Sequence, residues 1–203
     1  MITDCHTHRT DARDAIINVS PDFTEFLPGR FYSVGIHPWL TAEMAAEGIE
    51  RLMELLPVAA RRSDVVAIGE SGFDHLRGGD MGLQRELFNL HARLADDLGK
   101  PLIIHCVRAW NDLLHARRDM DPHAPWIVHG FRGKPELARQ LTDVGMYISL
   151  GERFNPATAP VIPPERLLVE TDESDQPIDA IAAAVSPTAL GDAARNLQKI
   201  LTL

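Results

Sequence analysis

The apolar residues of this chain recur in short runs, and segments with helical spacing lie between most of them. Eight of these runs are candidate β-strands, at residues 2–8, 15–20, 31–37, 65–70, 101–106, 126–129, 146–150 and 167–172. Short, near-continuous apolar runs that alternate with helices are typical of a parallel sheet. Eight of them predict an α/β fold, a compact TIM-type (β/α)8 barrel. Few residues separate the first three runs, so the early helices are expected to be reduced or absent.

Four segments have the spacing of amphipathic helices, at residues 41–56, 83–94, 135–141 and 190–201. Thr41 is expected to cap the first of them, and Gly99 to close the second. Pro135 suits the first turn of the third helix. The stretch between Pro177 and Pro187 is expected to be a short loop.

Length and composition restrict the class of protein. At about 150 residues per domain, 203 residues predict a single domain over residues 1–203. The hydrophobic content of 45% and charged content of 24% exclude a disordered or fibrous chain. No apolar run is long enough for a membrane span, no secretory signal is visible, and two cysteines form no disulfide framework, so a cytoplasmic protein is expected. The net charge of −9 argues against a protein that coats nucleic acid non-specifically.

Potential metal ligands stand at the ends of the predicted strands, namely His6, His8, Glu70, His105, His129 and Asp172. A parallel barrel carries its active site at the carboxyl ends of its strands, so these side chains are expected to converge. Strand alternation places His6 and His8 on one face together with Asp4, and it points Cys5 the other way. Each residue alone would more often be structural, but a buried cluster of histidines and carboxylates is costly without a cation.

Six ligands exceed the four that one tetrahedral zinc ion needs, so the pattern suits two divalent ions that share a bridging carboxylate. Mixed imidazole and carboxylate ligands favour zinc, manganese or iron, and magnesium is also possible. Two such ions would assist an in-line displacement by water without a cysteine or serine nucleophile. The other histidines, His75, His91, His115 and His123, are taken as background.

Six motifs resemble, in order, those of the TatD-like metal-dependent hydrolases: Asp4-Cys5-His6-Thr7-His8, Gly35-Ile36-His37-Pro38, Gly69-Glu70-Ser71-Gly72-Phe73-Asp74, Ile104-His105, His129-Gly130-Phe131 and Glu170-Thr171-Asp172. The resemblance implies a TIM-type barrel of the amidohydrolase superfamily that acts as a metal-dependent deoxyribonuclease or phosphodiesterase.

The resemblance also implies roles for single residues. His6 and His8 would bind a first ion with Asp172, and His105 and His129 would bind a second. Glu70 would bridge the two ions and, with Asp172, form the catalytic pair, in which Asp172 helps to take the proton from the attacking water. His37 would lie near the substrate.

The chain departs from the family pattern at the substrate side. Arg108 follows His105 one position later than the corresponding arginine of the family, and the loop after Asp172 is short. Independently of the family, five arginines follow predicted strand ends and are expected on the rim of the barrel: Arg9, Arg77, Arg108, Arg132 and Arg153. Guanidinium groups suit phosphate oxygens, so we expect an anionic substrate, with Arg108 in contact with it. The resemblance adds His37 to the expected substrate contacts.

The first hypothesis is a phosphoester hydrolase that uses two divalent ions, zinc, magnesium or manganese, on DNA ends or a small phosphodiester. An alternative is an amidohydrolase that cleaves a C–N bond of a small molecule, although no lysine stands at a strand end to bridge metals. A third is a non-catalytic metal-binding remnant with a partner-binding role. The sequence leaves open the native metal, the natural substrate, exo or endo action and the oligomeric state.

Overall fold

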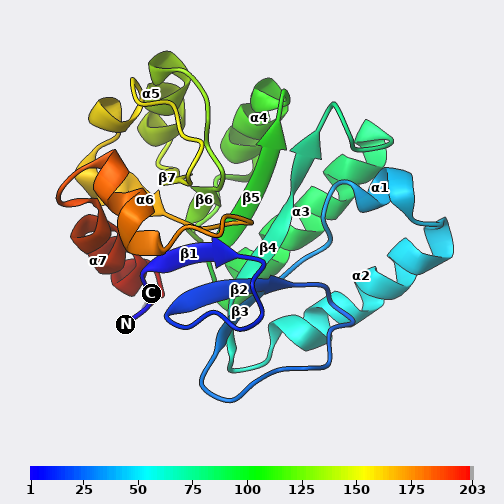
Figure 1. The fold of residues 1–203 in the computed structure, drawn as a ribbon. Coiled ribbons are helices and arrows are strands. Elements are labelled where there is room, and N and C mark those ends of the chain that lie inside the picture. Colours follow the sequence, from blue (N-terminus) through cyan, green and yellow to red (C-terminus); the bar gives the residue numbers. More distant parts are fainter. Residues whose placement is uncertain (202–203) are drawn as a thin grey trace.

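The chain forms one sheet of eight parallel strands with helices around it (Figure 1), in a computed structural model that describes residues 1–201. The strands follow one another in sequence order around the sheet. They are β1 (Asp4–Thr7), β2 (Ala15–Val19), β3 (Phe31–Val34), β4 (Val65–Asp74), β5 (Leu102–Val107), β6 (Trp126–Val128), β7 (Tyr147–Leu150) and β8 (Leu167–Val169).

The first and last strands meet just beyond the end of β8, where Thr7 and Asp172 form an isolated parallel bridge. The amide of Asp172 donates to the carbonyl oxygen of His6 at 2.9 Å, and the amide of His8 donates to the carbonyl oxygen of Asp172 at 3.2 Å. The barrel is therefore nearly closed, and its seam carries three of the expected ligands. The predicted (β/α)8 barrel is confirmed.

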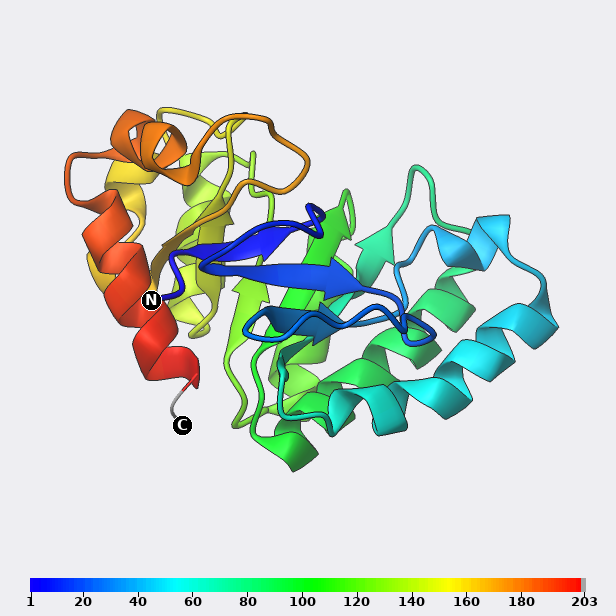
Figure 2. The same ribbon diagram turned by 60° about the horizontal axis from the view of Figure 1, so that its bottom comes forward.

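The helices are α1 (Leu40–Glu43), α2 (Ala46–Ala60), α3 (Met81–Leu98), α4 (Trp110–Met120), α5 (Pro135–Asp143), α6 (Ile178–Val185) and α7 (Ala189–Leu201), with two 3₁₀ turns, η1 (Ala159–Val161) and η2 (Pro164–Arg166). Figure 2 shows β1, β2 and β3 (blue) joined by loops, with α2 and α3 on one side and α6 and α7 on the other. Within residues 1–201, no helix separates these three strands, as predicted.

Two expectations about the helices are wrong. Thr41 does not cap the helix that follows it. It lies within α1, where its hydroxyl donates to the carbonyl oxygen of Pro38, and the residue at the N-cap of α2 is Ala45. The stretch after Pro177 is not a loop, because α6 occupies most of it. Helix α4 was not expected from periodicity, since most of its residues are polar and only Leu113 and Leu114 are buried.

Several strands also end elsewhere than expected. Strand β4 continues past Glu70 as far as Asp74, because it stays paired with β5 over this length. Strand β3 ends at Val34 and β8 at Val169, so that His37 and Asp172 stand on the segments that follow the strands. The barrel end therefore consists of one long strand and several short ones.

Aromatic packing fixes the outer face of β4 and β6. Phe73 of β4 lies 4.7 Å from Phe88 of α3 between ring centroids, and Phe88 lies 5.2 Å from Trp126 of β6. All three are almost fully buried. Because Phe73 faces α3, the alternate residues of β4 face the inside of the barrel. Among residues 1–201, no helix is both long and apolar enough for a membrane crossing.

Candidate metal centre

Glu70 lies at the middle of the centre, and the close contact of two strands holds it there. Its amide donates to Asn18 Oδ1 of β2 at 2.8 Å. Gly69 has a φ of +113°, which L side chains rarely adopt, and a Cβ at Gly35 would lie 2.5 Å from the carbonyl oxygen of Glu70. The two glycines thus let the β3 end approach β4 closely, and they set the position of a carboxylate that is only 2% exposed.

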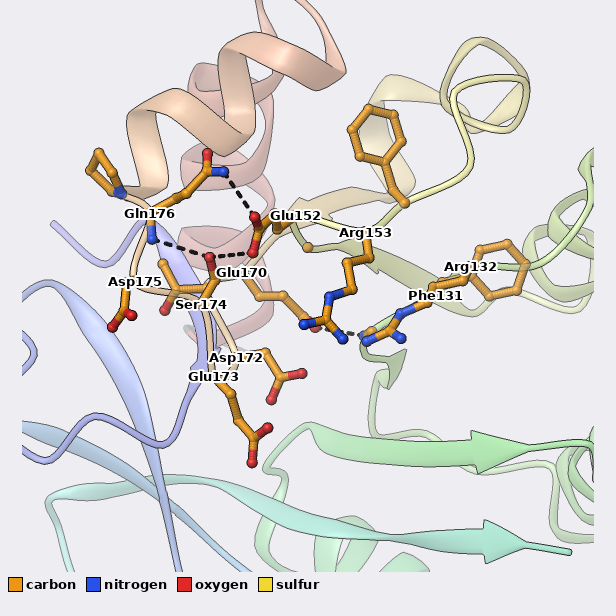
Figure 3. Close-up of a pocket in the computed structure, with 15 residues that line it drawn as sticks. Phe131, Arg132, Glu152, Arg153, Glu170, Asp172, Glu173, Ser174, Asp175 and Gln176 are labelled. Carbon is orange, nitrogen blue, oxygen red and sulfur yellow. Dashed lines mark hydrogen bonds between the residues drawn. The ribbon is translucent and has the colours of Figure 1, made fainter. Parts of the chain in front are cut away.

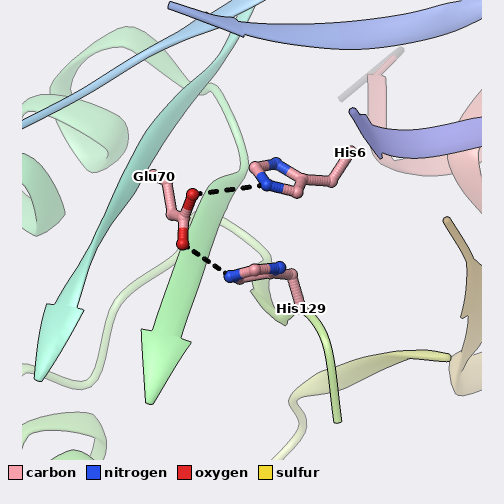
Figure 4. Close-up of side chains that lie close together, drawn as sticks. All are labelled: His6, Glu70 and His129. Carbon is pink, nitrogen blue, oxygen red and sulfur yellow. Dashed lines mark hydrogen bonds and ion pairs between the residues drawn. The ribbon is translucent and has the colours of Figure 1, made fainter. Parts of the chain in front are cut away.

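One oxygen of this carboxylate faces the first half of the centre, which we define as His6, His8 and Asp172. Glu70 Oε2 lies 3.3 Å from His6 Nε2 and 3.4 Å from His8 Nε2. Asp172 Oδ1 lies 3.9 Å from His6 Nε2 and 3.6 Å from His8 Nε2. Figure 4 shows one oxygen of the Glu70 carboxylate directed at His6 and the other directed at His129, and the two imidazole rings are neighbours with centroids 4.3 Å apart.

The other oxygen faces the second half of the centre, which we define as His37, His105 and His129. Glu70 Oε1 lies 2.7 Å from His129 Nε2, 2.9 Å from His105 Nδ1 and 3.1 Å from His37 Nε2. The structure thus brings the other five expected ligands together around the carboxylate of Glu70. It also brings in His37, which was expected near the substrate instead; its imidazole is as close to Glu70 as the other two.

Two carboxylates that sequence reasoning did not assign hold two of the three histidines of the second half, His105 and His129. Asp74 Oδ2 lies 3.0 Å from His105 Nε2 and accepts a hydrogen bond from Trp39 Nε1 at 2.7 Å. Glu170 Oε1 lies 3.4 Å from His129 Nδ1. Strand alternation could have indicated both, because Asp74 is four residues after Glu70 and Glu170 is two before Asp172.

The first strand does not follow simple alternation. Its register with β2 shifts between Asp4 and Thr7, which indicates a bulge. Asp4 therefore lies away from the histidines and accepts hydrogen bonds from the amide and hydroxyl of Thr171, at 3.0 and 2.6 Å. Cys5 lies toward Glu170, with its sulfur 3.8 Å from Glu170 Oε2. The expectations that Asp4 shares the face of His6 and that Cys5 points away are both wrong.

Charge pairing controls protonation in the centre. Burial alone would raise the pKa of Glu70 and Glu170, but the charge of His129 holds the pKa of each carboxyl below its usual range. Burial alone would lower the pKa of His129, but the two carboxylates hold it well above its usual value. Burial and the charge of His129 lower the pKa of His6. The carboxylates therefore favour positive charge at this position, which a bound cation also supplies.

The donor set fits divalent ions. Both ring nitrogens of His6 and Glu70 Oε2 are buried without a hydrogen-bond partner, an arrangement that is costly unless a cation completes it. Donor atoms within 4.8 Å of one another form four groups: His6, Glu70 and His129; His6, His8 and Asp172; His37, Glu70 and His105; and His129, Glu170 and Asp172. The groups share residues, as expected where neighbouring ions share ligands.

The remaining residues named from the sequence lie outside this cluster. Arg108 is exposed after β5. Arg77 packs on Trp39, with its guanidinium carbon 3.2 Å from the ring centroid, and Arg9 lies 3.7 Å from Asp11. His91, taken as background, is fully buried on α3, where its Nε2 accepts from the amide of Ile36 at 2.9 Å. It therefore anchors the segment that carries His37.

Comparison with known proteins gives one consistent result. The family model described as TatD related DNase matches residues 5–202. An uncharacterized metal-dependent hydrolase of Buchnera aphidicola subsp. Acyrthosiphon pisum is 32% identical over 70% of this chain and 58% of its own length. A 3'-5' ssDNA/RNA exonuclease TatD of Pantoea ananatis is 33% identical over 69% of this chain and 56% of its own. The chain thus spans less than two thirds of the length of these curated relatives.

Among solved structures, a TatD homolog of Escherichia coli, YJJV, superposes with a TM-score of 0.78 at 22% identity, over 93% of this chain and 86% of that one. A TatD family hydrolase of Entamoeba histolytica gives a TM-score of 0.62 at 25% identity, over 77% of this chain and 59% of that one. The first of these likenesses, at its low identity, concerns the barrel alone.

Proposed function

Because the chain belongs to the TatD-related DNase family, we propose that it is a divalent-metal-dependent hydrolase that cleaves phosphoester bonds with an activated water. The observation that supports this most directly is the position of Glu70, with one carboxylate oxygen toward each half of the centre. A carboxylate placed in this way can hold two ions at once. Zinc, magnesium and manganese are the candidates, and two ions are proposed because the donor groups share Glu70 and His129.

The proposal gives each residue of the centre a task. His6, His8 and Asp172 hold an ion in the first half, His105 and His129 hold one in the second, and Glu70 contacts both. Divalent ions held there lower the pKa of water and stabilise charge on the phosphoryl group. Asp74 and Glu170 keep His105 and His129 in the tautomers that leave one ring nitrogen of each free for an ion.

Asp172 is the proposed acceptor for the proton of the attacking water. Burial, together with the charge of Glu170, raises the pKa of the Asp172 carboxyl above its usual value. Its side chain is 26% exposed, against 2% for Glu70. Asp172 is therefore the carboxylate of the two that a substrate and a water molecule can reach directly.

DNA ends or a small phosphodiester are the proposed substrates. Relatives named 3'-5' ssDNA/RNA exonucleases support a nucleic-acid end, and the rim arginines support an anionic ligand. An amidohydrolase with a bridging lysine is less well supported, since Glu70 has the bridging position. Lys100 donates to the carbonyl oxygens of Ala60 and Arg62, at 2.5 and 3.2 Å, and has no contact with the centre.

Metal reloading tests the proposal. The protein is stripped with a chelator, reloaded separately with zinc, manganese or magnesium, and assayed on bis-p-nitrophenyl phosphate and on a single-stranded oligonucleotide, with bound metal measured by elemental analysis. We expect turnover that requires a divalent ion and up to two ions per chain. Two bound ions without turnover of any phosphoester would instead favour the non-catalytic alternative, and turnover of a cyclic amide alone would favour the amidohydrolase.

A further inference from the structure

A cavity of about 510 Å³ opens beside Asp172, between the segments that follow β6, β7 and β8. Arg132 lines it from the segment after β6, and Arg153 lines it from the segment after β7. Figure 3 shows both guanidinium groups pointing into the space on whose other side Asp172 lies. Two cations from separate segments thus face one cavity that begins at the metal centre.

Neither arginine forms an ion pair or a hydrogen bond with the acidic residues that also line the cavity, which include Glu170, Glu173 and Asp175. Within the part of the chain that the structure describes, neither guanidinium has a carboxylate within 4.0 Å or a hydrogen-bond partner, and both residues are exposed. Glu152 is adjacent to Arg153 in the chain, but its two carboxylate oxygens accept from Ser174 Oγ at 2.7 Å and Gln176 Nε2 at 2.9 Å. The acid nearest in sequence is therefore engaged elsewhere.

The other arginines of the rim differ in this respect. Arg77 pairs with Glu43 at 3.3 Å and lies on the ring of Trp39, and Arg9 lies 3.7 Å from Asp11. Arg108 does not line the cavity. Of the five arginines expected on the rim, only Arg132 and Arg153 combine a free guanidinium with a shared cavity, which is the arrangement that forked recognition of a phosphate needs.

The cavity lies to one side of the centre. Asp172 and Glu170 line it, whereas His8, Glu70 and His105 do not. A phosphate between the two arginines is therefore a different group from the one held at Glu70. We propose that Arg132 and Arg153 clamp a second phosphate of the substrate, next to the phosphoester that is cleaved; this rests on the proposed hydrolase function. The substrate class is then a phosphodiester with a neighbouring phosphate, such as the end of a nucleic-acid strand.

Dinucleotide substrates distinguish the binding of a second phosphate by the two arginines from the cleavage of the phosphoester bond. TpT carries the scissile phosphate alone, whereas pTpT and TpTp carry one further phosphate on either side. For the wild type we expect at least one of the two longer substrates to have a lower KM than TpT. Arg132→Gln and Arg153→Gln should each raise that KM by about 10-fold, the loss expected for a charge-assisted hydrogen bond, and leave the KM and kcat of TpT unchanged. Arg139→Gln, at an exposed arginine of α5, is the matched control.

Each outcome bears on one of the two proposals. If the arginine variants change the KM of TpT and of the longer substrates equally, or change neither, the proposed clamp is overturned and the proposed hydrolase function is not affected. Failure of the wild type to cleave any of the three with any ion would count against the hydrolase instead. Equilibrium binding of pTpT and TpTp in chelator then tests the clamp without turnover: it should weaken in both arginine variants but not in Arg139→Gln, and unchanged binding would overturn it.

Discussion

The two halves of the metal centre share one carboxylate but hold their histidines differently. In the first half, both ring nitrogens of His6 lack a hydrogen bond, and the side chain of His8 is 38% exposed. In the second half, the side chains of His105 and His129 are 11% and 7% exposed, and each directs its other ring nitrogen toward a carboxylate. The first half combines a fully buried His6 that lacks a second partner with a more exposed His8, whereas His105 and His129 of the second half are buried and oriented.

This difference indicates which half of the centre binds its metal ion more tightly. A histidine whose second nitrogen is bound to a carboxylate is held in the orientation and tautomer that a metal needs, and such outer partners are worth about 10- to 100-fold in metal affinity. We therefore expect the second half to bind its ion more tightly, and the first half to exchange its ion with solvent. Asp172, a member of the first half, also lines the cavity.

The largest effect is expected where the halves meet. Glu70→Gln keeps the shape of the side chain but removes the charge that both halves use. We expect kcat/KM on bis-p-nitrophenyl phosphate to fall on the order of 1,000-fold, as when a preorganised electrostatic contact is lost, and bound metal to fall in both halves. Elemental analysis measures the second effect. Glu86→Gln on the exposed side of α3 is the control, and full metal content with normal turnover in Glu70→Gln would refute the shared role.

Acid is expected to destabilise the fold through His91, which anchors the segment that carries His37. Burial lowers the pKa of His91 from 6.5 to about 4, while its ring joins the carbonyl oxygen of Leu87 to the amide of Ile36, next to His37. The unfolded chain takes up this proton near pH 6.5 and the folded chain near pH 4. The contribution of His91 to the free energy of unfolding is therefore fully present above pH 6.5. It is lost as the pH falls toward 4, and the loss is at most about 3 kcal/mol.

Urea unfolding of the wild type and of His91→Gln, measured between pH 4 and pH 7.5, isolates that contribution. Glutamine does not titrate, so the difference in free energy of unfolding between the two proteins should shrink as pH falls through this window. A difference that stays constant with pH would show that His91 is not the group responsible. His115→Gln, at an exposed histidine of α4, serves as the control.

The sequence predicts the barrel well because the relevant signal is local. Apolar runs indicate strands whatever surrounds them, and all eight were found. The ligands were equally visible, since His6, Glu70 and Asp172 end or follow such runs. Helix α6 was missed because eight residues give too little periodicity, and α4 because its buried side is narrow.

What the sequence did not predict depends on contacts between distant segments. The bulge in β1 is a mismatch between two strands, and nothing in the β1 residues alone places Asp4 beside Thr171. Asp74 and Glu170 look like ordinary strand-end acids until a histidine from another strand meets each of them. Strand alternation places both carboxylates on the face of the ligands, but only the fold pairs Asp74 with His105 and Glu170 with His129.

The Asp74→Asn substitution is expected to weaken metal binding in the second half and not in the first. Asp74 Oδ1 accepts from the amides of Leu76 and Arg77, at 2.7 and 2.9 Å, and asparagine keeps this oxygen. The oxygen lost is Oδ2, which faces His105. We expect a 10- to 100-fold weaker ion in the second half and an unchanged ion in the first, read from chelator competition. Asp112→Asn, at a half-buried acid paired with Arg85 and His75, is the control. Equal weakening of both ions would contradict the division of the centre.

The smallest effect is expected one contact further out, at Trp39→Phe. The indole donates to the same Asp74 oxygen that faces His105, so its removal leaves that carboxylate freer to turn away. Phenylalanine still offers a ring to Arg77, so the loss is that of one hydrogen bond, about 1 kcal/mol, or about 5-fold in affinity of the second-half ion. Trp110→Phe, on α4, is the matched control. If Trp39→Phe instead weakens binding of the ion in the first half, Trp39 acts on the centre by a route other than Asp74. The two halves would then differ in the burial of their histidines and not in how carboxylates orient them.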